Sequence, residues 1–156
     1  MHVQLETTAD IGKSVNIKRE KSGDKEIVVA HLKFANTPVM REQFDELANR
    51  PIGWSAGFLF DEFGAPVGHI ELSFPMLALC VTGKIRGIRG EEITLTQAGL
   101  TGVEFSLADK GAILSGELTW EVAGDEVSDL EPLIGRTCIL AVVVQDGGQQ
   151  DMLKAA

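Results

Sequence analysis

The chain has 156 residues, 44% of them hydrophobic and 24% charged, with a formal net charge of −9. This length can bury a core without disulfides or a metal, while the acidic charge disfavours nucleic acid and anionic membranes as partners. No apolar run approaches the roughly 18 residues of a membrane-spanning helix, so no membrane segment is expected.

The first half of the chain alternates apolar and polar residues in several short stretches, which is typical of half-buried strands. Gly23 lies in a charged turn between two of them, and Pro75 interrupts a later one. Because proline donates no hydrogen bond, that strand is expected to lie at an edge, to bulge, or to be two pieces. The strands are expected at 3–5, 15–19, 27–34, 54–60 and 69–81, with a helix at 41–49.

The stretch from 91 to 145 specifies its structure most clearly. Three strands and the Gly111 turn precede a short helix at 126–134, and the apolar run 138–144 reads as a strand covered on both faces. The expected core, allowing for immediate neighbours, is Ile93, Leu95, Phe105, Leu118, Trp120, Leu130, Ile139, Ala141 and Val143.

These elements predict an α+β fold, mainly antiparallel β with two short helices. Residues 15–60 and 103–144 both read as hairpin, helix and strand, which indicates a degenerate duplication of a β-β-α-β unit. We expect a single domain over 1–146 and a flexible tail over 147–156.

No group of residues forms a catalytic or metal-binding pattern. Gly53-Trp54-Ser55-Ala56-Gly57 matches the nucleophile motif of hydrolases, but it is expected to follow a helix and enter a strand, the reverse of the required context. The histidines and cysteines are scattered singly, so no metal or cofactor is expected. The sequence therefore predicts a protein that is not an enzyme.

Two cysteines, Cys80 and Cys138, lie within apolar runs and are expected to be reduced core thiols without a mutual disulfide. The chain does not open with a charged segment followed by an apolar one, so no signal peptide is expected. Both observations favour the cytoplasm.

Two stretches are candidate binding sites. The apolar segment with Phe74, Met76 and Leu77 cannot join the middle of a sheet, so something should cover it, and a homodimer is favoured over a monomer. The basic, glycine-bearing stretch with Lys84, Arg86 and Arg89 is the candidate anion or nucleic-acid contact. An exposed, solvated connector is the favoured interpretation of the basic stretch.

Several short motifs, in this order, resemble a family of small uncharacterised proteins encoded in phage and prophage genomes, near early recombination and replication genes. The resemblance covers residues 30–145, and the chain departs from the family at Lys110-Gly111, where Gly-Gly is usual. It implies a bacterial host and no activity or site residues. The motifs are Leu32-Lys33-Phe34, Phe74-Pro75-Met76-Leu77, Glu92-Ile93-Thr94-Leu95, Val103-Glu104-Phe105-Ser106-Leu107 and Gly111.

Two functions follow as expectations. The favoured one is a non-enzymatic, phage-encoded accessory protein that binds and modulates another protein of host or phage DNA-processing or defence machinery. The alternative is a nucleic-acid-binding accessory to phage recombination, which would use Lys84, Arg86 and Arg89. A small hydrolase or metal enzyme is the least favoured of the three.

Overall fold

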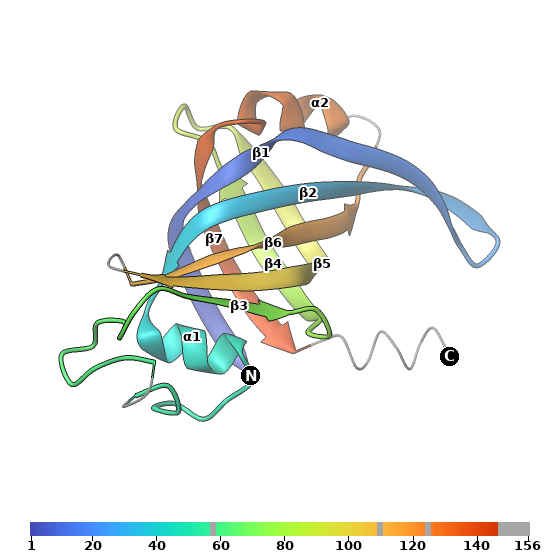
Figure 1. Cartoon of the computed structure of the whole chain (residues 1–156). Coiled ribbons are helices and arrows are strands. Elements are labelled where there is room, and N and C mark those ends of the chain that lie inside the picture. Colours follow the sequence, from blue (N-terminus) through green and yellow to red (C-terminus); the bar gives the residue numbers. More distant parts are fainter. Residues whose placement is uncertain (57–58, 109–110, 124–125, 147–156) are drawn as a thin grey trace.

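The computed structural model describes residues 1–56, 59–108, 111–123 and 126–146. Within these residues the chain forms long antiparallel strands, two short α-helices and one 3₁₀ turn (Figure 1). The elements are β1 (His2–Ser22), β2 (Lys25–Val39), α1 (Arg41–Leu47), β3 (Ile70–Phe74), β4 (Leu79–Arg86), β5 (Glu92–Ala108), β6 (Gly111–Glu121), α2 (Glu126–Leu130), η1 (Glu131–Leu133) and β7 (Thr137–Asp146).

Six of these strands close into an antiparallel barrel in the order β5-β4-β7-β1-β2-β6, and β6 returns to β5. The two ends of the chain meet in it, because His2 pairs with Gln145 and Asp10 with Thr137. β3 lies outside the closed circuit, on the lower half of β5. The prediction of an α+β fold is therefore wrong. The chain is a mainly β barrel, and closure depends on pairings between distant segments that local periodicity does not encode.

One close approach in the barrel requires glycine. A Cβ atom at Gly83 of β4 would collide with the carbonyl oxygen of Ala141 in β7. The φ angle of Gly83 is 151°, a value that side-chain-bearing residues rarely adopt. Gly83 therefore permits the tight contact between β4 and β7 that helps to close the barrel.

The helices lie near opposite ends of the barrel, α1 beside the N-terminus and α2 at the far end (Figure 1). Phe44 of α1 is fully buried, and its ring packs edge-on against Phe105 at 4.8 Å and Phe60 at 6.0 Å between centroids. Leu130 and Leu133 are buried at the other end. Because the helices are short and serve as covers, they do not form a layer against an open sheet.

Several predicted elements differ from the structure. The strands predicted at 3–5 and 15–19 belong to the single strand β1, which is irregular between Ile11 and Val15. The strand predicted at 54–60 is absent among the described residues of that segment, where isolated bridges join Phe60 to Ala56 and Pro66. The stretch 69–81 is two strands, β3 and β4, separated by a turn at Pro75.

The predicted core is confirmed in β5, β6 and α2 but shifted by one residue in β7. Ile93, Leu95, Phe105, Leu118, Trp120 and Leu130 are all buried. In β7 the inward residues are Cys138, Leu140, Val142 and Val144, and the predicted Ile139, Ala141 and Val143 are only partly buried. A one-residue change of register exchanges the two faces of a strand, and a uniformly apolar run gives no sign of which face is inward.

The strand order is symmetric about the β2–β6 pair, reading β3-β5-β6-β2-β1-β7. Each hairpin is thus flanked by the strand that follows the other hairpin's helix. This arrangement is compatible with the predicted duplication, with β3 in place of the expected strand at 54–60. The predicted tail, 147–156, lies outside the described residues, as do residues 109–110 of the predicted Gly111 turn.

The two cysteines are free and lie far apart. Cys80 pairs with Gln145, which is seven positions beyond Cys138 on β7. At ~3.3 Å per residue this places the two thiols about 23 Å apart, beyond the reach of a disulfide. Among the described residues, no helix has the length and apolar character needed to cross a membrane.

Candidate protein-binding surface

A buried carboxylate organises the loop that follows α1. Asp45 has no exposed surface, although it lies on a short surface helix. Its Oδ2 accepts a hydrogen bond from the backbone N–H of Gly53 at 2.9 Å, and its Oδ1 accepts one from the N–H of Ser55 at 3.1 Å. These bonds fold the chain back after α1, with Ile52 and Trp54 left at the surface.

The hydrolase-like motif at 53–57 is part of this turn. Ser55 is completely buried, and its hydroxyl has no hydrogen-bond partner among the described residues. Its backbone N–H is committed to Asp45. A buried serine with no neighbouring base within the described residues cannot present its oxygen to a substrate, so the motif is a structural turn.

Four side chains form what we call the α1-end surface: Arg50, Ile52, Trp54 and Met76. The guanidinium carbon of Arg50 lies 5.2 Å from the centroid of the Trp54 ring, a cation–π contact. Met76 is 92% exposed and Ile52 64%. Arg50 and Met76 also line one shallow hollow of about 370 Å³, formed between the end of α1 and the β3–β4 turn.

The predicted interface residues divide between the core and the surface. Phe74 is partly buried, and its ring packs edge-on against Phe105 at 5.8 Å. Leu77 also packs against the core, and its N–H donates to the carbonyl of Phe74 to close the turn. Met76, at the tip of this turn, is the one of the three that faces solvent.

The predicted basic loop is not a cluster of free cations. Lys84 and Arg86 lie on β4, where Lys84 Nζ is 2.8 Å from a carboxylate oxygen of Glu92 and an Arg86 nitrogen is 3.0 Å from one of Glu6. Arg89 lies in the following turn, and its backbone N–H donates to Glu91. Acidic neighbours therefore offset the positive charge that the sequence brings together here.

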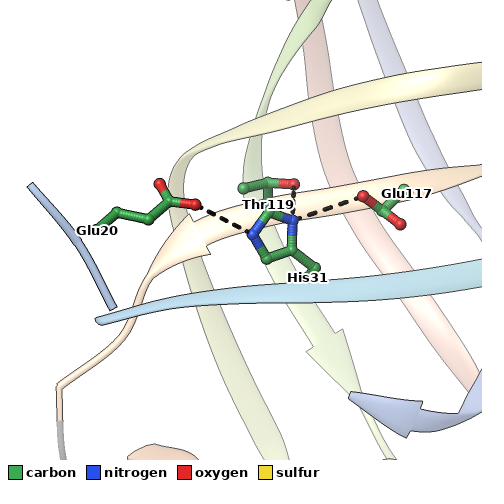
Figure 2. Close-up of polar contacts among 4 residues, drawn as sticks. All are labelled: Glu20, His31, Glu117 and Thr119. Carbon is green, nitrogen blue, oxygen red and sulfur yellow. Dashed lines mark hydrogen bonds and ion pairs between the residues drawn. The ribbon is translucent and has the colours of Figure 1, made fainter. Parts of the chain in front are cut away.

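A histidine is held between two carboxylates on the outer face of the barrel (Figure 2). Nε2 of His31 lies 3.5 Å from Glu20, and Nδ1 lies 3.5 Å from Glu117 and 3.3 Å from the hydroxyl of Thr119. Because the two carboxylates approach opposite ring nitrogens, they do not converge on a common point where a metal could sit. No group of three metal-ligating side chains occurs in the described part of the chain.

Sequence reasoning missed Asp45, Arg50, Ile52 and Trp54. An aspartate inside a short amphipathic helix usually faces solvent, so its burial carries no sequence signal. The available signal was the pair Ile52 and Trp54 beyond the helix-ending Pro51, where neither side chain can extend the apolar face of α1. Their assignment to a strand concealed this signal.

No protein-family model, curated protein or solved structure matches this chain.

Proposed function

We propose that this protein is a non-enzymatic accessory protein that binds another protein through the α1-end surface. The observation that carries the proposal is the position of its exposed apolar side chains. Of the eight large hydrophobic residues that are exposed in the described chain, six lie between the end of β2 and the start of β4. They are Met40, Ile52, Trp54, Phe63, Val67 and Met76.

Such a concentration is the usual mark of an interaction site, because exposed apolar surface is otherwise scattered. The composition also fits, since tryptophan, arginine and methionine are enriched at protein interfaces. The buried Asp45 supports this surface from below by fixing the loop that carries Ile52 and Trp54. A loop held in one conformation loses less entropy when it binds.

The chemistry of the surface also indicates what the partner presents. An apolar side chain would fill the hollow beside Met76, and a carboxylate would pair with Arg50. None of the residues that line the hollow is acidic. A symmetric pair of copies would bring Arg50 towards its own counterpart, so we favour a foreign protein over a homodimer.

The resemblance to phage early-region proteins leads us to infer that the partner belongs to DNA-processing or defence machinery of the host or the phage. Free cysteines support a reducing compartment, and we infer the cytoplasm of a bacterial host. The alternative contact through Lys84, Arg86 and Arg89 is not favoured, because Lys84 and Arg86 are paired with carboxylates.

Met76→Lys and Ile88→Lys form a matched pair for testing the proposal. Both residues are exposed, at 92% and 88%, but Ile88 lies near η1 at the other end of the barrel. The tagged protein is used to capture partners from the bacterium that produces it. We expect a partner that the wild type and Ile88→Lys retain and Met76→Lys loses; identical captures by all three proteins would contradict the proposal.

Sedimentation of the same three proteins at micromolar concentration distinguishes the kind of partner. A mass of one chain for the wild type is expected if the partner is foreign. A mass of two chains that only Met76→Lys reduces to one would make a second copy the partner instead.

A further inference from the structure

The β1–β2 hairpin extends beyond the barrel as a two-stranded ribbon. β7 leaves β1 after the Asp10–Thr137 pair, and β6 leaves β2 after the Val29–Glu121 pair. Beyond these points the two strands pair only with each other, as far as Ser22 and Lys25. At ~3.4 Å per residue, this free part is about 14 Å long. Figure 1 shows it reaching away from the other strands.

This ribbon has the opposite charge to the rest of the chain. Residues 11–34, which we call the ribbon, contain six basic and three acidic residues, a formal charge of +3. The other 132 residues contain eight basic and twenty acidic residues, a formal charge of −12. The net charge of −9 therefore hides a basic element on an acidic body.

The ribbon lysines are available to a ligand. Lys13, Lys18, Lys21, Lys25 and Lys33 are all exposed, and none forms an ion pair with another described residue. The strand register places Lys18, Lys25 and Lys33 on one face. This face is the one that carries His31, and Lys18 and Lys33 line a shallow hollow of about 290 Å³ there with Ser14, Asn16 and Glu117.

His31 engages the two carboxylates nearest to these lysines. It contacts Glu20 of the ribbon on one side and Glu117 of β6 on the other (Figure 2). Both carboxylates are held beside the imidazole ring and are not paired with Lys18 or Lys33. The hydroxyl of Ser14 and the amide of Asn16 add hydrogen-bond donors to the two ammonium groups.

We propose that the ribbon binds double-stranded DNA through its phosphates. The major groove of B-form DNA, about 12 Å wide, admits a two-stranded β-ribbon, whereas the major groove of A-form RNA is too narrow and deep. Sequence-tolerant binding of single strands uses exposed aromatic rings for stacking. The one aromatic residue of the ribbon, Phe34, is buried in the core.

The acidic body does not prevent this contact. Charges are screened over a Debye length of about 8 Å at physiological salt, and the free part of the ribbon is longer than that. Repulsion from the body would still weaken binding overall, so we expect moderate affinity with a strong dependence on salt.

Fluorescence anisotropy with a labelled 20-base-pair duplex tests the proposal across a range of salt concentrations. Each phosphate that a variant no longer neutralises reduces the slope of log K against log salt by about 0.9. Lys18→Gln/Lys25→Gln is therefore expected to reduce the slope by about 2 and the affinity by roughly 10-fold at low salt. Circular dichroism checks that the variant folds as the wild type does.

The matched control is Lys84→Gln/Arg86→Gln, which removes two cations from the barrel wall and is checked for folding in the same way. This variant should bind the duplex as the wild type does. The proposal is overturned if the wild type shows no salt-dependent binding, if the control loses affinity as the ribbon variant does, or if a single strand of the same sequence binds more tightly than the duplex.

Discussion

Leu32 of β2 and Leu118 of β6 lie directly opposite each other in the antiparallel pair at the centre of the symmetric strand order. Two residues away on either side, Phe34 faces Gly116 and Trp120 faces Ala30. All of these apolar side chains are buried. Each large aromatic residue therefore sits across from a small one, so that the two hairpins pack closely without overfilling the barrel.

Gly116→Ala tests this size match. A Cβ atom at Gly116 would lie 2.8 Å from a methyl carbon of Leu100 and 3.3 Å from the carbonyl oxygen of Thr101. Overpacking of this kind is expected to lower the free energy of unfolding by about 1–3 kcal/mol in urea titrations. Gly99→Ala is the control, because its nearest neighbour atom would be 3.8 Å away. Equal stability of the two variants would contradict the proposed packing.

Asp45→Ala tests the support of the α1-end surface. The change removes the acceptor for two backbone N–H groups, at Gly53 and Ser55, and unsatisfied buried donors cost about 1–3 kcal/mol. We expect faster hydrogen exchange at these two amides and weaker partner capture. Glu42→Ala on the exposed side of the same helix is the control. Unchanged exchange at Gly53 and Ser55 in Asp45→Ala would disprove this role.

Asp10 connects three strands and should make stability depend on acid pH. Its carboxylate accepts hydrogen bonds from the hydroxyl of Thr137 on β7 at 2.6 Å and from the amide of Asn36 on β2 at 2.7 Å. Both bonds, that of Thr137 first, lower the pKa of Asp10 below its usual 3.8. A lowered pKa means that the stabilisation is present above about pH 4 and is lost as the pH falls through the folded value.

Thr137→Val removes the larger of these two contributions. The variant should be less stable than the wild type near neutral pH, and the difference should shrink as the carboxylate is protonated. Thr8→Val, at another exposed threonine of the barrel, controls for the loss of a hydroxyl. A difference that stays constant from neutral to strongly acid pH would exclude the Asp10 carboxylate as its cause.

The local elements of this fold could be predicted from the sequence, whereas its closure could not. The β5 strand is revealed by the alternation of Val103, Phe105 and Leu107, and the break between β3 and β4 by Pro75. The pairing of His2 with Gln145 joins opposite ends of the chain. No local pattern specifies such a contact, so the predicted set of strands was compatible with both an open sheet and a barrel.

The candidate sites depended even more on tertiary structure. An apolar interface segment was predicted, but Phe74 and Leu77 turn inward and only Met76 remains outside. The basic residues that were singled out are adjacent in sequence to one another, and their partners Glu6 and Glu92 are brought in by strand pairing. The ribbon lysines are spread over two strands, so their common face became evident only from the register.

Photo-crosslinking from position 76 tests the central claim, protein binding through the α1-end surface, most directly. A photoreactive amino acid is placed at Met76 or, as the control, at Ile88, and the protein is irradiated inside the producing bacterium. We predict a discrete covalent adduct with a second polypeptide from position 76 and not from position 88, and its loss when Trp54→Lys is added. The absence of an adduct at position 76, or the same adducts from both positions, would contradict the account.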